Sequence, residues 1–296
     1  MRRPSLRGWT TAICIFVALG DVAPRAARGE WLAPLIVEDA QTLPSGQIDV
    51  ALGASYFRNR RFPAFTREGY IRWQDLITVP ELALRAAVGS RVEIQASYEF
   101  IDLHENTQDA GTRSKFGGGD ARLFTKIYAV REQTWIPAVG FRFGVKLPNA
   151  NSKDRLGTDA TDFIIQSLVS KRFGGFSAHL NLGVAILDNA TTLVGRPPNL
   201  TGGQDDLFTY AIGVVSPTAT IARNWGIRGL LDVAGTTGSR FSNDGNAMRG
   251  GVQVMYGGWT GYAGASAGLN SAAEQFGLMG GVIYAFDVER LTTLFE

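Results

Sequence analysis

The chain has 296 residues, enough for one large domain or two small ones, and its mean hydropathy of +0.00 is that of an ordinary soluble protein. Its 36 glycines exceed the roughly 7% typical of proteins and favour tightly turned β structure. The formal net charge of +2 belongs to the first residues, because the rest carries 24 Lys and Arg against 26 Asp and Glu. That balance excludes the basic footprint of a nucleic-acid-binding protein.

The N-terminus is typical of a secretory signal peptide. Arg2, Arg3 and Arg7 precede an apolar stretch, Trp9–Gly20, which is shorter than the roughly 20 residues of a membrane-spanning helix. Ala27-Arg28-Gly29 supplies small residues for cleavage before Glu30. An uncleaved anchor helix is the alternative. Cleavage would remove Cys14, the only cysteine, so the exported protein would have no disulfide and no thiolate chemistry.

After the signal, period-two alternation recurs, which indicates strands with one apolar and one polar face. In 91–102, for example, Val92, Ile94 and Ala96 oppose Glu93 and Gln95. The expected strands, in chain order, are 46–57, 78–88, 91–102, 119–130, 135–147, 161–173, 176–187, 207–220, 225–234, 248–257, 259–269 and 275–286. Pro80, Pro137 and Pro217 are expected near strand ends, where a missing donor is tolerated.

The connections predict the architecture. Short links (89–90, 131–134, 174–175, 221–224) alternate with long polar ones (58–77, 103–118, 148–160, 188–206, 235–247), and only 270–274 departs from this order. This alternation favours a closed antiparallel up-and-down transmembrane β-barrel of about twelve strands, with short periplasmic turns and long extracellular loops. The expected organisation is a signal peptide (1–29), a periplasmic N-terminal segment (30–45), an outer-membrane barrel (46–286) and a C-terminal tail (287–296).

Aromatic residues also gather near the two ends of the expected strands, as in the interfacial girdles of membrane barrels. One group lies beside the short links: Phe173, Phe176, Trp135, Trp225, Trp259, Tyr284 and Phe286. The other lies toward the long loops: Tyr56, Tyr98, Phe100, Phe208 and Tyr210. A secreted β-sandwich with an aromatic core is the alternative, but strands of ten to twelve residues suit a membrane span better.

If lipid covers the apolar face, the polar face must line the lumen. The lumen-lining candidates are Asp49, Glu81, Arg85, Glu93, Glu99, Asp120, Arg122, Lys126, Arg142, Lys146, His179, Asn181, Arg228 and Asp232. Four of them, Arg122, Lys126, Arg142 and Lys146, form a basic ladder on neighbouring strands. The ladder either selects anionic solutes or is neutralised in salt bridges with the nearby carboxylates, and the second interpretation is favoured.

Further pieces of sequence carry a family pattern: Leu35–Ala40 before Gly46, Gly117–Arg122 leading to Lys126, Pro137-Ala138 with Lys146-Leu147-Pro148, Ser170–Gly183 with His179-Leu180-Asn181, and Asn270–Phe276 before a last strand ending on Tyr284 and Phe286. Together they resemble the bacterial outer-membrane family named after the meta-pathway of phenol degradation, often called transporter-like. The resemblance implies movement of small, often hydrophobic or aromatic compounds across the outer membrane. Family members end near Phe286, so residues 287–296 are an addition.

Three functions are compatible with such a barrel. A passive small-molecule channel is favoured, since about twelve strands give a lumen between those of eight-stranded and 16-stranded barrels. An outer-membrane lipid hydrolase would need a His-activated Ser, and the chain has only His104 and His179 and no Gly-x-Ser-x-Gly elbow. A structural surface barrel could bind lipopolysaccharide phosphates through the basic first loop, with Arg58, Arg60, Arg61, Arg67 and Arg72.

No cofactor, metal site or nucleotide site is expected. The sequence lacks a His/Cys cluster, and Phe116–Asp120 lacks the Lys and helix of a phosphate-binding loop. The expected partners are outer-membrane lipid, lipopolysaccharide and an unidentified small solute, with no nucleic acid. The expected location is the bacterial outer membrane.

Overall fold

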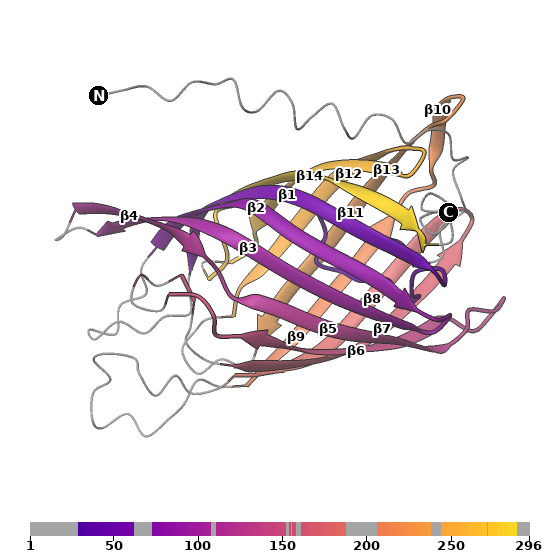
Figure 1. Cartoon of the computed structure of the whole chain (residues 1–296), viewed down its shortest axis with the longest axis horizontal. Helices are drawn as coiled ribbons and strands as arrows, with labels where there is room; N and C mark the ends of the chain where they lie inside the picture. Colours follow the sequence, from indigo (N-terminus) through magenta and orange to yellow (C-terminus); the bar gives the residue numbers. More distant parts are fainter. Residues whose placement is uncertain are drawn as a thin grey trace, which may run out of the picture.

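All strands of the chain pair antiparallel in one sheet that closes on itself, because β1 pairs with both β2 and β14 (Figure 1). This computed structural model describes residues 29–61, 73–107, 111–151, 154, 156–157, 161–187, 206–237, 244–270 and 272–288. The strands are β1 (Gln47–Arg61), β2 (Trp73–Val88), β3 (Val92–Thr107), β4 (Gly111–Gly118), β5 (Ala121–Val130), β6 (Ala138–Leu147), β7 (Asp162–Phe173), β8 (Phe176–Ile186), β9 (Leu207–Val215), β10 (Ala219–Ala222), β11 (Trp225–Thr237), β12 (Asn246–Tyr256), β13 (Trp259–Gly268) and β14 (Phe276–Asp287).

The barrel has twelve strand positions, as the sequence predicts. β4 and β5 both pair with β3 and follow one another along it, so they occupy one position. β9 and β10 likewise both pair with β11, and the break between them contains Pro217. Closure gives the strands of the barrel a paired neighbour on both sides, which is the condition for β structure in hydrocarbon, whereas β4 and β10 are paired on one side in the described residues.

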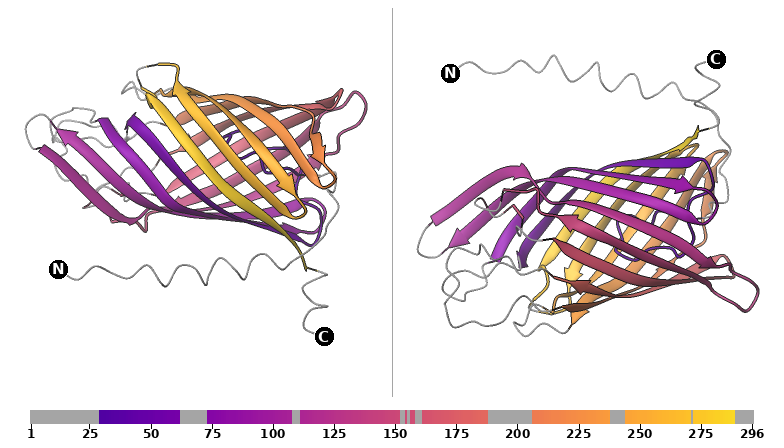
Figure 2. Two further views of the ribbon diagram at one scale, coloured as in Figure 1. Left: turned by 90° about the horizontal axis from the view of Figure 1, so that it is seen from above. Right: turned by 60° about the horizontal axis from the view of Figure 1, so that its bottom comes forward.

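Several strands extend beyond their predicted ends on the side of the long connections. The sequence predicts a long loop at 103–118, but most of it forms a hairpin of β3 and β4 that projects past the rest of the barrel (Figures 1 and 2). β2 begins at Trp73, so Pro80 lies inside this strand at a register shift and not near its end. The bulge accommodates the missing donor of proline.

The predicted signal (1–28 of 1–29) and the tail from residue 289 lie outside the described residues. So do 62–72 and the side chains of Arg60 and Arg61, so the structure does not describe most of the basic first loop. Within the described ranges, no helix is long and apolar enough to cross a membrane.

The two predicted aromatic groups lie at opposite ends of the strands. Near the short turns, Trp225 packs on Tyr256 with ring centroids 4.8 Å apart, and Trp259 packs on Tyr284 at 4.5 Å. Near the long connections, Tyr98 lies edge-on to Phe100 at 5.3 Å. Two aromatic groups at opposite strand ends are the arrangement of the interfacial girdles of membrane barrels.

The outward face of the barrel is apolar. Large side chains remain exposed there, such as Ile212 at 58%, Leu278 at 54% and Phe163 at 51%. Many polar side chains between them along the strands are buried inside, such as Asp49, Glu93 and Asp232. This is the inverse of a soluble barrel, whose outer face must be polar, and it suits lipid as the outer solvent.

Ile212→Arg should therefore destabilise the barrel by about 2–4 kcal/mol if its position is near the bilayer midplane. Equilibrium unfolding by urea in lipid vesicles would measure this. Trp135→Arg is the control, because Trp135 is 92% exposed in a short connection beyond the strands and should tolerate the charge. Equal stability of the two variants would contradict a lipid-facing exterior.

Candidate functional site

The barrel interior contains the N-terminal segment, residues 30–46, which leads into β1 at Gln47. Figure 2 shows this indigo segment inside the barrel, toward the end with the short turns. The sequence predicts a periplasmic segment at 30–45, whereas the structure has these residues inside the barrel. Glu30 N–H donates to Asp39 Oδ2 at 3.2 Å, so the segment doubles back on itself as a loop. We call residues 30–43 the lumenal loop.

Two wall side chains hold the backbone at the centre of the lumenal loop. Asp232 on β11 accepts hydrogen bonds from the N–H groups of Ile36 and Val37 at 2.8 and 3.0 Å. Asn181 on β8 bonds both to the N–H and to the carbonyl of Glu38, at 2.6 and 2.9 Å. These bonds satisfy backbone groups that would otherwise be buried without partners. Two sequence-predicted residues, Asp232 and Asn181, are therefore brought together by the loop.

Arg228 and Gln253 hold the start of the loop. Arg228 on β11 forms a salt bridge with Glu30 and donates to Gln253 Oε1 on β12 at 2.6 and 2.8 Å. The amide nitrogen of Gln253 then donates to the carbonyls of Trp31 and Ala33 at 2.9 and 2.6 Å. Gln253 is absent from the predicted candidates, although it lies at an inward position of the same period-two pattern.

The carboxylate of Glu38 lies in a ring of wall residues on β2, β3, β5 and β6. We call this the Glu38 site; its wall members are Arg85, Glu93, Gln95, Lys126 and Arg142. Glu38 carboxylate oxygens lie 3.8 Å from Lys126 Nζ and 3.8 Å from Arg142, and they accept a hydrogen bond from Gln95 at 3.4 Å. Burial acts to raise the pKa of Glu38, but the charges of Arg142, Arg85 and Lys126 outweigh burial and lower the pKa. Glu38 is therefore an anion.

Glu93 connects the rest of the Glu38 site. Arg85 Nε donates to Glu93 Oε1 at 2.7 Å, Gln95 donates to the same atom at 2.8 Å, and Lys126 Nζ lies 3.2 Å from it. The other carboxylate oxygen of Glu93 accepts from Leu43 N–H at 2.8 Å. The site thus holds the lumenal loop at both Glu38 and Leu43.

The lumenal loop covers polar side chains on both sides of the barrel. Glu93, Lys126 and Gln253 are each 0% exposed, Asp232 is 1% exposed and Asn181 is 2% exposed. These side chains come from opposite sides of the barrel, β3 and β5 facing β11 and β12 in strand order. Solvent does not reach them while the loop lies against the wall.

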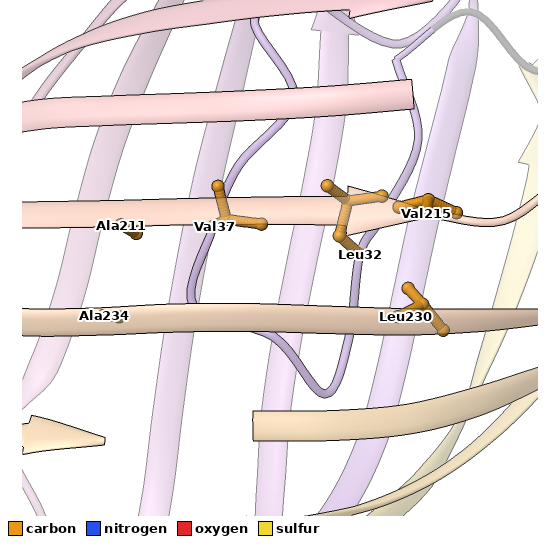
Figure 3. Packing of buried hydrophobic residues seen from close by; sticks show 6 residues of the cluster. All are labelled: Leu32, Val37, Ala211, Val215, Leu230 and Ala234. Atoms are coloured by element: carbon orange, nitrogen blue, oxygen red, sulfur yellow. The ribbon is translucent and has the colours of Figure 1, made fainter. Parts of the chain in front are cut away.

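Apolar contacts and small wall residues complete the fit. Leu32 and Val37 of the loop pack on Val215 and Ala211 of β9 and on Leu230 and Ala234 of β11 (Figure 3). Gly213 and Gly264 are needed for this close approach. A Cβ at Gly213 would lie 2.6 Å from Val37, and one at Gly264 would lie 2.3 Å from Pro34. The glycine-rich wall is therefore shaped to the loop.

The other predicted lumen residues form separate pairs. Arg122 bonds to Glu99 at 3.0 Å, and Lys146 lies 2.5 Å from Asp162 and 3.8 Å from Asp120. Glu81 accepts from Ser55 at 2.5 Å, and Asp49 accepts from Gln47 at 2.6 Å. Every member of the basic ladder thus lies beside a carboxylate, the salt-bridged arrangement favoured from sequence. Lys126 pairs both with Glu93 of the wall and with Glu38 of the loop, and Arg142 pairs with Glu38.

His179 is buried in a hydrogen-bonded chain. Ala40 N–H donates to Ser170 Oγ at 2.9 Å, and Ser170 Oγ lies 2.8 Å from His179 Nδ1. His179 Nε2 lies 3.0 Å from Ser177 Oγ, and the tautomer of the ring decides which nitrogen donates. In the part of the chain that is described, no group of three or more His, Cys, Asp and Glu is placed to hold a metal ion.

No protein-family model and no curated protein matches the sequence. Among solved structures, the chain is similar to an outer-membrane channel from Pseudomonas putida F1, with 15% identity, 84% of this chain and 98% of that chain covered, and a TM-score of 0.59. It also matches the β-domain of the Bordetella autotransporter BrkA (12% identity, 82% and 100% covered, TM-score 0.49). The likeness to the Pseudomonas channel shows the fold: that of an outer-membrane β-barrel.

Proposed function

We propose that this protein is a passive outer-membrane channel for small molecules, exported with a cleaved signal peptide, and closed in the present conformation by the lumenal loop. The observation that carries the proposal is that the lumenal loop lies inside the barrel. A purely structural barrel can fill its interior with wall side chains. Here a segment outside the sheet occupies the interior; it is held to the wall by single hydrogen bonds and ion pairs, and the chain joins the wall at Gln47.

The construction of the wall supports a movable loop. None of the strand pairings involves residues 30–46, so withdrawal of the loop breaks no ladder of the closed sheet. It would instead expose charged and amide side chains, which water solvates well. A polar lumen that water can enter is the property of a diffusion channel.

We also propose that the chain belongs to the family named after the meta-pathway of phenol degradation. Support comes from where the family-like pieces lie. Leu35–Ala40 is the centre of the lumenal loop, and Ser170, His179 and Asn181 of another piece line its binding site. Pieces that are far apart in sequence thus meet at one place in the structure. The family resemblance adds hydrophobic and aromatic compounds as candidate solutes.

The surroundings of His179 support a non-enzymatic role. His179 is 4% exposed, and both of its ring nitrogens lie beside serines inside the barrel, away from the lipid that a hydrolase would act on. For partners, we propose membrane lipid around the apolar exterior and lipopolysaccharide at the basic first loop.

A reversible cross-link between loop and wall tests the channel proposal. Leu32 of the loop and Val215 of β9 belong to one packed cluster, and both are larger than cysteine, so Leu32→Cys/Val215→Cys can be cross-linked without excluding the loop. The mature chain otherwise lacks cysteine. The oxidised protein should pass no current in planar bilayers, and reduction should restore the conductance of the unmodified chain. The single variant Leu32→Cys is the control, unaffected by oxidation. If neither the reduced double variant nor the unmodified chain passed current, the channel proposal would be wrong.

A further inference from the structure

We propose that the Glu38 site is a binding site for the carboxylate of a small organic monocarboxylate, which competes with Glu38 and so favours release of the lumenal loop. This inference rests on the proposed channel function and names a solute class for it. In the closed state Glu38 is a carboxylate supplied by the protein itself, and it occupies the position of the ligand.

The contacts of Glu38 are those that a bound carboxylate requires. Arg142 and Lys126 approach its oxygens at 3.8 Å, and the amide of Gln95 donates to it at 3.4 Å. Arg142 is held in place independently of Glu38, because it donates to Gln95 Oε1 at 2.9 Å and to Gln166 Oε1 at 3.0 Å. Its guanidinium also stacks 3.6 Å above the ring of Phe124. The wall therefore keeps its donors oriented when Glu38 leaves.

The wall of the Glu38 site has more cations than carboxylates. Arg85, Lys126 and Arg142 are cations, and among the described residues Glu93 is the wall carboxylate that forms ion pairs with two of them. Glu38 supplies a further carboxylate, from the loop. Loss of Glu38 would leave an uncompensated buried cation, which costs several kcal/mol unless water or another anion replaces it. A monocarboxylate restores the balance, whereas a neutral solute does not.

Donors in the wall also remain unused. Arg85 Nη2 is buried without a hydrogen-bond partner, and Lys126 Nζ, although it lies 3.2 Å from Glu93 Oε1, forms no well-directed hydrogen bond. Glu38 reaches Lys126 only at 3.8 Å because its backbone is held by Asn181. A free carboxylate has no such tether and can approach these donors at the 2.7–2.9 Å of charge-assisted bonds. This gives an external ligand an advantage over Glu38.

Hydrogen exchange of the full mature chain, read by mass spectrometry on a peptide covering the lumenal loop, tests the site with benzoate as probe. Amides of Ile36, Val37, Glu38 and Leu43 bond to the wall, so release of the loop should speed their exchange. At fixed ionic strength benzoate should accelerate exchange several-fold, and benzamide, which has the same size and no charge, should not. Equal effects of the two probes, or none from benzoate, would overturn the inference.

Variants separate site from fold. Arg142→Gln should raise the benzoate concentration needed for half of the acceleration about tenfold or more, because one charge-assisted hydrogen-bond partner is lost. Arg142→Lys should recover part of the loss. Lys115→Gln, on β4 in an exposed pair with Asp154 away from the lumenal loop, is the control and should respond as the wild type does. If benzoate speeds exchange but no current follows, the channel function fails and the site stands. If current flows and benzoate leaves exchange unchanged, the site fails and the channel stands.

Discussion

Deletion of residues 30–43 from the mature chain should raise its single-channel conductance in planar bilayers several-fold. The reason is geometric. The loop occupies the interior at a level where inward side chains on opposite walls, such as Lys126 and Gln253, are 0% exposed. Without it, the space that the loop now fills admits water and ions, and the strand ladders remain complete because none includes these residues.

The same deletion leaves polar wall groups without their present partners. Asp232, Asn181 and Glu93 each lose bonds to loop amides, and water can replace these bonds once the lumen is hydrated. The barrel should therefore still fold, which its resistance to unfolding by cold detergent would report. A matched control replaces residues 30–43 by a Gly/Ser stretch of equal length, which should also conduct well because it has neither Glu38 nor Val37. A folded deletion variant with unchanged conductance would show that the constriction lies elsewhere.

The fold was predictable because strands of a membrane barrel have a local sequence pattern. Alternation in 91–102 reflects one lipid-facing and one inward face, so the position of a residue in the alternation is enough to predict its environment. The ends of strands were less predictable. Residues 103–118 are polar and lack an apolar face, yet they continue the ladder as a hairpin, because beyond the membrane neither face needs to be apolar.

The site was predictable only in part, for a related reason. Wall residues such as Arg85 and Asp232 lie at inward positions of regular strands, so the period-two alternation alone predicts that they face the lumen. The lumenal loop has no repeating pattern, and its contacts are long-range: Ile36 and Asp232 are 196 residues apart, and Glu38 and Asn181 are 143 residues apart. Nothing local in 30–45 distinguishes a segment that enters the barrel from one that stays in the periplasm.

One sequence signal did point toward the loop. The wall is rich in glycine at inward positions, where a polar or bulky residue would fill the lumen unaided. Gly213 and Gly264 face Val37 and Pro34, and side chains there would exclude the loop. A barrel whose inward face lacks bulk on several strands requires another piece of chain, or a bound molecule, to fill it.

Glu93→Gln should destabilise the folded barrel by about 3–5 kcal/mol, the usual result of removing one partner from a buried ionic cluster. Glu93 is 0% exposed and balances Arg85 and Lys126, which are 3% and 0% exposed. The amide has nearly the volume of the carboxylate, so the change in stability reports the loss of charge and not a change in packing. Neither cation can reach water while the lumenal loop is in place, and the glutamine amide would add a donor where only acceptors are useful.

The matched variant is Glu99→Gln on the same strand, whose partner Arg122 is 38% exposed. Solvent screens that pair, so its loss should cost only about 0–1 kcal/mol. Urea titrations of both variants in lipid vesicles would measure the difference. If the two variants lost similar stability, the interior around Glu93 would have to be hydrated, and the barrel could not be closed at the level of the lumenal loop. A large loss for Glu93→Gln alone would place the electrostatic centre of the closed state at this carboxylate, which is bonded at once to the wall and to Leu43 of the loop.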